Sequence, residues 1–149
     1  MKKFLSILSL IMVVASLQTI SATNLSGINS IIESRALTKH IGNLHTDMRG
    51  KPHDIVDFAL YYSNGTLQIP KFKVGKMPGS IQVSASGIKE GTTQRFTDSV
   101  FLTILGSTTK YDANILVTTE ATKLKVVIDV IDPIYDGASF IAHVVFTEK

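Results

Sequence analysis

The sequence predicts an all-β domain, an immunoglobulin-like antiparallel β-sandwich of about seven strands. Two observations carry this prediction. Apolar and polar residues alternate with a period of two along much of the chain, which strands satisfy and helices do not. Such segments recur about every ten residues and are closed by Gly, Pro or Asn, as in sandwiches. A small closed barrel is the main alternative, because the same alternation fits it.

The expected strands are supported by the residues within and between them. Ile81, Val83 and Ala85 alternate with polar residues, which is typical of a strand with one buried face. The pair Asn64-Gly65 is a strong short hairpin signal. Pro70 cannot donate to a ladder, so its strand lies at an edge or breaks there. The seven expected strands span residues 54–62, 66–74, 80–86, 96–105, 114–119, 124–131 and 139–147.

Residues 23–52 lack a clear alternation. Apolar residues at spacings of three and four favour a helix from about Ile28 to His40. Read as a strand, the same residues divide between two faces, and an extension that orders only on a partner is a third interpretation. The sequence therefore predicts a helical or irregular lead-in over residues 23–52, followed by the β domain at residues 53–149.

Residues 1–22 have the features of a secretory signal peptide. Lys2 and Lys3 follow the initiator Met, an apolar stretch comes next, and Ala22 supplies the small residue before the expected cleavage site. The longest uninterrupted apolar run, Leu10–Ala15, is far shorter than the ~20 residues that span a bilayer. We expect a mature chain that is periplasmic, surface-bound or secreted, with no integral membrane segment.

The composition excludes several function classes. The chain has no cysteine, which excludes a disulfide framework, a thiolate metal site and a cysteine nucleophile. Once Lys2 and Lys3 are removed, 13 basic residues stand against 12 acidic ones, so the charge gives no argument for nucleic-acid binding.

Histidines and carboxylates crowd one stretch, HTDMRGKPHDIVD. Imidazole and carboxylate groups together can bind zinc or another divalent ion, which leaves a metal-dependent hydrolase as a minor hypothesis. The spacing matches no zinc motif, so a polar connection before a strand is the preferred interpretation. The candidate ligands are His45, Asp47, His53, Asp54 and Asp57.

Other catalytic signatures are missing. No Gly-x-Ser-x-Gly elbow and no glycine-rich phosphate loop occurs in the sequence. Asp129, Asp132 and Asp136 fit turn-forming residues better than a pair of facing catalytic carboxylates. We therefore expect a protein that is not an enzyme and that needs no cofactor.

Charge is divided along the chain. Residues 23–89 carry a net +4 and residues 90–149 a net −3. Lys71, Lys73 and Lys76 place positive charge around one edge-like strand. Complementary patches could steer association between copies. The alternative is a solvated edge whose lysines discourage aggregation.

The segment Asp136-Gly137-Ala138-Ser139, with the alternating strand after it, resembles the closing strand of secreted bacterial adhesin and pilus subunits of the chaperone–usher kind. The resemblance covers about 15 of the 149 residues. It implies an incomplete immunoglobulin-like fold that a neighbour's N-terminal extension completes by strand addition. It further implies an acceptor groove, read by a periplasmic chaperone and lined by Phe140, Ala142, Val144 and Phe146. The donor extension would contain Leu25, Ile28 and Ile31.

These patterns predict an exported, non-enzymatic structural or adhesive subunit of a bacterial surface assembly. Such a subunit would build a fimbria, would serve cell adhesion and virulence, and would associate with a protein partner or with itself. The alternative is a self-contained periplasmic or secreted β-sandwich module that binds a ligand or a protein.

Overall fold

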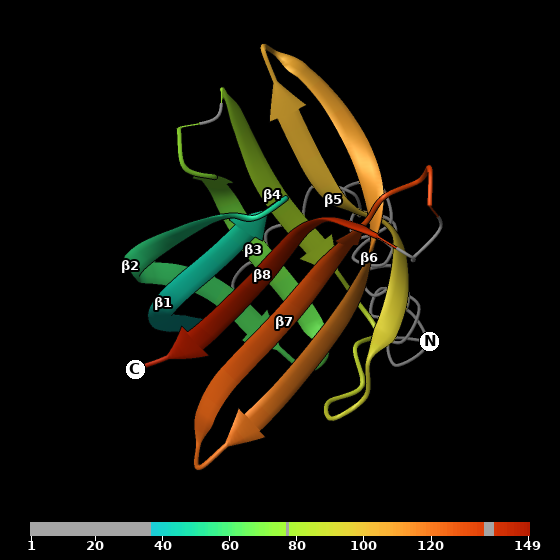
Figure 1. Ribbon diagram of the computed structural model, residues 1–149. Coiled ribbons are helices and arrows are strands. Elements are labelled where there is room, and N and C mark those ends of the chain that lie inside the picture. The colour runs from blue at the N-terminus through green and yellow to red at the C-terminus, as the bar shows by residue number, and fades with distance from the viewer. Residues whose placement is uncertain (1–36, 77, 136–138) are drawn as a thin grey trace, which may run out of the picture. The chain divides into compact units, whose positions relative to one another are not determined.

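Eight antiparallel strands form a closed barrel in the computed structural model, which describes residues 37–76, 78–135 and 139–149. Each strand pairs with its neighbours in sequence, and β1 pairs with β8, so the ring closes. Figure 1 shows β8, in red, lying between β1 and β7. The strands are β1 Thr38–Met48, β2 Lys51–Ser63, β3 Thr66–Lys73, β4 Gly79–Ala85, β5 Gln94–Ile104, β6 Ser107–Glu120, β7 Lys123–Ile131 and β8 Phe140–Glu148.

The predicted immunoglobulin-like sandwich is wrong. All seven predicted strands are confirmed, but β1 is an eighth strand, and it lies where a helical or irregular lead-in was predicted. The described residues contain no helix. β1 pairs with β2 along one side and with β8 along the other, which leaves no open edge between the first and last strands. The barrel that the alternation also allowed is therefore the fold.

The sequence pattern did not predict β1, because the residues at its inward positions are only weakly apolar. Leu44 and Met48 are buried as expected, but the buried positions before and between them are Gly42 and Thr46. Ile41, the most prominent aliphatic residue of the strand, points outward and is 46% exposed. A bulge between Gly42 and Leu44 further disturbs the alternation against β2.

Apolar side chains fill the interior. Every strand contributes its inward positions, in line with an eight-stranded barrel whose inside is just wide enough for side chains. Burial of these groups is the main favourable contribution to folding. The largest fully buried side chains are Phe146, Leu44, Leu60, Leu67, Ile69, Ile81, Ile115, Ile128, Val83, Val100, Val117 and Val126.

The connections between strands define two ends of the barrel. The turn end carries residues 49–50, 74–76, 78, 105–106, 132–135 and 139. The terminal end carries the other connections, the start of β1 and the end of β8. Four connections are two-residue hairpins, and the predicted Asn64-Gly65 hairpin is confirmed, with φ values of 49° and 76°. Positive φ at both positions is the type I′ geometry that matches strand twist.

The β4–β5 connection, residues 86–93, packs against the terminal end. Ile88 is buried there, and its N–H donates to the Gly65 carbonyl at 2.9 Å. The Glu90 carboxylate accepts hydrogen bonds from the Tyr62 hydroxyl at 3.1 Å and from Thr119 Oγ1 at 3.3 Å. Glu90 thus ties β2 to β6 across this end, and the connection is held on the barrel.

Candidate functional site

The ring closes most weakly between β2 and β3. Only three residue pairs join these strands: Tyr61↔Gln68, Tyr62↔Leu67 and Ser63↔Thr66. Residues 51–55 and 58–60 of β2 pair with β1 on one side, Val56 and Asp57 lie in the bulge between them, and none of residues 51–60 is paired with β3. In β3, Ile69, Phe72 and Lys73 pair with β4 only, and Pro70 and Lys71 between them are paired with neither neighbour. We call the interval between these two unpaired edges the seam.

Pro70 explains why the ladder stops. Proline has no N–H to donate, and it lies two residues beyond Gln68, the last residue of β3 that pairs with β2. The β3–β4 register shifts at the same place, between Ile69 and Phe72. The sequence predicted that this strand lies at an edge or breaks at Pro70: the pairing with β2 does stop before Pro70, but β3 itself does not break and continues to Lys73. The predicted basic edge is not a full sheet edge, because β3 has a neighbour on each side.

The turn between β1 and β2 determines which backbone groups face the seam. Arg49 and Gly50 both have positive φ, at 51° and 79°, so Met48 and Lys51 flank a type I′ turn and exchange both backbone hydrogen bonds. Alternation from this pair directs the N–H and C=O groups of residues 51, 53 and 55 toward β1. The hydrogen bond from Thr46 Oγ1 to the His53 carbonyl, 3.1 Å, agrees with that direction.

The same alternation points the backbone groups of Asp54 and Val56 into the seam. Pro52 contributes only a carbonyl there. Asp57 has φ 57° and is the extra residue of the bulge against β1, so it ends the regular run. The seam therefore contains a short free strand edge on β2. Its backbone N–H donors belong to Asp54 and Val56, whose side chains face outward.

A cleft of about 570 Å³ lies at the turn end of the seam. Its described lining combines apolar side chains with two lysines and a histidine, and no carboxylate is among these lining residues. The β3–β4 connection approaches β2 here, because a Cβ on Gly75 would lie 4.0 Å from the Cβ of His53. The lining residues are Met48, Lys51, Pro52, His53, Val74, Gly75, Lys76 and Pro78.

Side chains rather than backbone hydrogen bonds join the two strands along the seam. The rings of Phe58 and Phe72 meet edge to face, with centroids 5.7 Å apart and planes inclined at 77°. Ile55 and Phe58 point inward but are only half-buried, whereas Phe72 is buried. Apolar surface therefore remains accessible beneath the free edge of β2.

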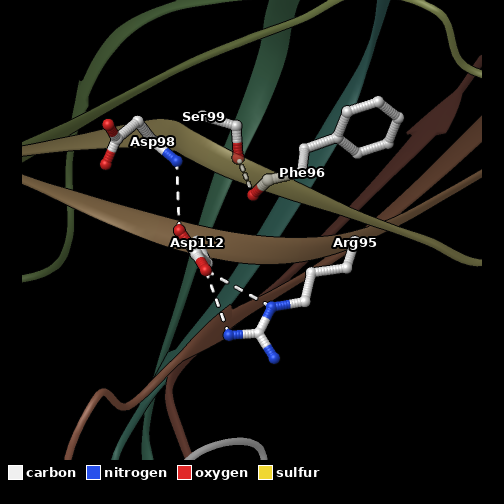
Figure 2. Close-up of polar contacts among 5 residues, drawn as sticks. All are labelled: Arg95, Phe96, Asp98, Ser99 and Asp112. Atoms are coloured by element: carbon white, nitrogen blue, oxygen red, sulfur yellow. Dashed lines mark hydrogen bonds and ion pairs between the residues drawn. The ribbon is translucent and has the colours of Figure 1, made fainter.

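A polar cluster separate from the seam lies on the outer surface, at a bulge in β5. Asp98 has φ 51°, and its N–H donates to Asp112 Oδ1 at 3.1 Å. Arg95 donates to Asp112 Oδ2 from Nε at 3.3 Å and from Nη2 at 3.0 Å. Figure 2 shows these donors converging from β5 on the single carboxylate of β6. The Asp98 N–H, with Arg95, holds the pKa of Asp112 below its usual value of 3.8.

Two further titratable groups with shifted pKa values, Tyr62 and Glu148, form hydrogen bonds at the terminal end of the barrel. Burial, together with the neighbouring Glu90 carboxylate, raises the pKa of Tyr62 to about 12. Burial alone would raise the pKa of Glu148, but hydrogen bonds from the Leu124 N–H and from His40 outweigh it and leave that pKa below 4.5. Glu148 thereby links β8 to β7 and β1. These contacts join strands at the terminal end of the barrel.

The stretch that suggested a metal site is divided by the barrel. His45 contacts Asp54 across β1 and β2 at 2.6 Å, on the outer surface. His53 lines the cleft, and His143 pairs with Asp129 at 2.5 Å. Within the described residues, no group of three or more His, Asp or Glu side chains could hold a metal ion. The β1–β2 hairpin thus distributes these residues among separate contacts.

The remaining predicted site residues have different positions. Ala142, Val144 and Phe146 are buried in the barrel core, so they line no groove. Phe140 does not share their face, because a register shift between Val130 and Ile131 leaves it 40% exposed. Leu25, Ile28 and Ile31 lie outside the described residues. Lys71 and Lys73 are exposed on β3, and Lys76 lines the cleft.

Sequence reasoning missed the seam and its cleft. Pro70 indicates in the sequence that a ladder of hydrogen bonds ends near it. The sequence does not show that β2 is the strand that loses its pairing there. Comparison with models of protein families, with curated proteins and with solved structures finds no match to this chain.

Proposed function

We propose that this protein is an exported, non-enzymatic binding module that holds an anionic, partly apolar ligand in the cleft of the seam. The lining of that cleft carries the proposal. Met48 and Val74 supply apolar surface, Lys51 and Lys76 supply positive charge, and none of the lining residues that the structure describes is a carboxylate. Binding sites of this kind combine apolar walls with a few polar groups that fix orientation.

The closed ring favours a self-contained module over a subunit that awaits a neighbour's strand. β1 and β8 are paired to each other within one chain, and the inward side of β8 is already covered. A complete core needs no donor segment to bury it. The positions expected to form an acceptor groove are occupied by the chain's own packing, which argues against the adhesive-subunit interpretation.

Charge and export features support the same proposal. The strands of the seam belong to the half of the chain with a net +4, and such a surface attracts anionic ligands. The signal-peptide features of residues 1–22 support an extracytoplasmic site of action. No helix in the described part of the chain is long and apolar enough to cross a membrane.

The fluorescent anion 8-anilinonaphthalene-1-sulfonate tests the cleft directly. It combines a sulfonate with aromatic rings, so it should bind the native protein and fluoresce. The double variant Lys51→Glu, Lys76→Glu should bind it several-fold more weakly, because both charges of the rim are reversed. The matched control is Lys89→Glu, Lys125→Glu, which reverses two lysines outside the cleft.

Equal loss in both double variants, or no loss in the first, would refute a ligand site at the seam. Circular dichroism and denaturant unfolding should accompany each titration, since a loosened core also binds this dye. The module interpretation has its own test. A second copy of residues 23–36 appended after Lys149 should leave the unfolding midpoint unchanged, whereas a large stabilisation would favour the adhesive-subunit interpretation.

A further inference from the structure

We infer that the ligand of this site is an extended peptide segment that adds to β2 as a further strand at the seam. This inference rests on the proposed binding function and specifies what the cleft recognises. The observation behind this inference is the free edge of β2, where the backbone groups of Asp54 and Val56 point away from β1 and no residue of β3 pairs with them.

A peptide backbone matches this edge because its donors and acceptors repeat along the chain. Asp54 and Val56 each present one N–H and one C=O at the spacing of alternate strand residues. An antiparallel or parallel segment satisfies both residues with ladder hydrogen bonds, in the mode called strand addition. A compact organic anion reaches the lysines but leaves these alternating groups to water. The backbone therefore selects a polypeptide.

The side chains around the free edge of β2 determine which residues the bound peptide should have at its inward and outward positions. Successive residues of an added strand point alternately inward and outward. Inward residues meet Met48, Val74 and the half-buried Ile55, so they should be apolar. Outward residues come near the exposed Lys71 and Lys73 of β3, so they should be acidic.

The two carboxylates on this part of β2 are already engaged. Asp54 contacts His45 at 2.6 Å, and Asp57 forms an ion pair with Lys149. Their repulsion toward an acidic segment is reduced by these partners. The bulge at Asp57 limits the contact, so the segment pairs with the stretch between Pro52 and Asp57, beside the cleft.

Substitutions at Val56 separate backbone recognition from side-chain recognition. Val56 is 65% exposed and is not paired with β1, so its replacement disturbs neither the core nor that ladder. Val56→Pro removes the N–H that faces the seam, and Val56→Thr keeps it with a side chain of similar shape. Both variants should unfold cooperatively at nearly the wild-type midpoint.

The probe is a phage-displayed library of random short peptides selected on the full mature protein. The enriched peptides should alternate apolar residues with Asp or Glu. Synthetic versions should bind Val56→Thr like the wild type and Val56→Pro about tenfold more weakly, the effect expected from one lost backbone hydrogen bond. Their binding should also slow hydrogen exchange at the amides of Asp54 and Val56.

The outcomes separate this inference from the proposed function. Selected peptides that bind Val56→Pro as tightly as Val56→Thr would overturn strand addition, as would a selection that enriches no peptide. If 8-anilinonaphthalene-1-sulfonate still binds and responds to the Lys51 and Lys76 reversals, the cleft remains a ligand site and only the peptide inference fails. If neither probe binds, both proposals fail.

Discussion

Burial in the barrel opposes the ionisation of Tyr62. Its pKa is about 12 in the folded protein and near 10.0 when unfolded, because burial and Glu90 both disfavour the phenolate. The unfolded state therefore loses this proton first. The contribution of Tyr62 to stability is complete below pH 10 and is lost as the pH rises through 12.

Denaturant unfolding at a series of alkaline pH values measures this loss. Tyr62→Phe should flatten the decline of unfolding free energy above pH 10, since the titrating group is gone. Glu90→Gln should bring the Tyr62 pKa closer to its ordinary value, which ultraviolet titration of the phenolate can follow. If the unfolding free energy of Tyr62→Phe falls above pH 10 as steeply as that of the wild type, a group other than Tyr62 causes the loss of stability at alkaline pH.

Asp112 stabilises an otherwise unfavourable backbone conformation at the β5 bulge. Asp98 has φ 51°, a region that L-residues seldom adopt, and its N–H bonds to the Asp112 carboxylate. Asp112→Ala should lower the unfolding free energy by about 1 kcal/mol, the typical value for a partly exposed hydrogen-bonded group. Urea unfolding at neutral pH measures this cost.

The pH dependence of Asp112 has the opposite sign to that of Tyr62. The folded pKa lies below 3.8, so the stabilisation is present above that pH and is lost as the pH falls through the folded pKa. Asp98→Gly is the matched control, because glycine accepts a positive φ and keeps the N–H. It should be neutral or slightly stabilising, and a loss as large as that of Asp112→Ala would contradict this account.

Among the elements, the β1–β8 contact depends on the absence of a side chain at Gly42. A Cβ at this position would lie 2.1 Å from the Thr147 carbonyl oxygen, a contact that only movement of backbone can relieve. Gly42→Ala should therefore cost about 3 kcal/mol or more in unfolding free energy, at the high end of overpacking effects.

Asn43→Ala, one residue further along β1, is the control for this substitution because its side chain is exposed. It should change the urea midpoint little. If Gly42→Ala has a midpoint close to that of the wild type, the close approach of β1 to β8 at the bulge is incorrect, and the closure of the ring at this point would need revision.

For the molecule as a whole, closure places the start of β1 next to the end of β8. The Lys149 N–H donates to the Ile41 carbonyl at 3.2 Å, and β1 and β8 are paired. A circular permutant that joins Lys149 to Leu37 through a short Gly/Ser linker and opens at the Ala121–Thr122 turn should fold. Both changes fall at exposed positions and keep every strand in its ladder.

The permutant should remain β-rich by circular dichroism and should unfold cooperatively. Opening at the Asn64-Gly65 turn instead should be more harmful, because that hairpin supplies the only three pairs between β2 and β3. Equal behaviour of the two permutants would indicate that the seam is not the weakest junction of the ring.

Much of the fold could be predicted from the sequence because strand faces are a local property. The alternation of Ile81, Val83 and Ala85, and the positive-φ preference of Asn64-Gly65, depend on neighbours in the chain. These signals located seven strands. β1 was missed because Gly42 and Thr46 occupy inward positions, and local hydrophobicity therefore does not mark its buried face.

Tertiary structure decided the rest of the fold and most of the site. Alternation is the same in a sandwich and in a barrel, because both bury one face of each strand, so only the pairing of β1 with β8 distinguishes them. The cleft likewise brings together the start of β2 and the connection after β3, which are distant in sequence. The sequence by itself determined which side chains turn inward, since that follows from the geometry of one strand. Which edges meet, and where an edge stays free, depends on hydrogen bonds between distant segments.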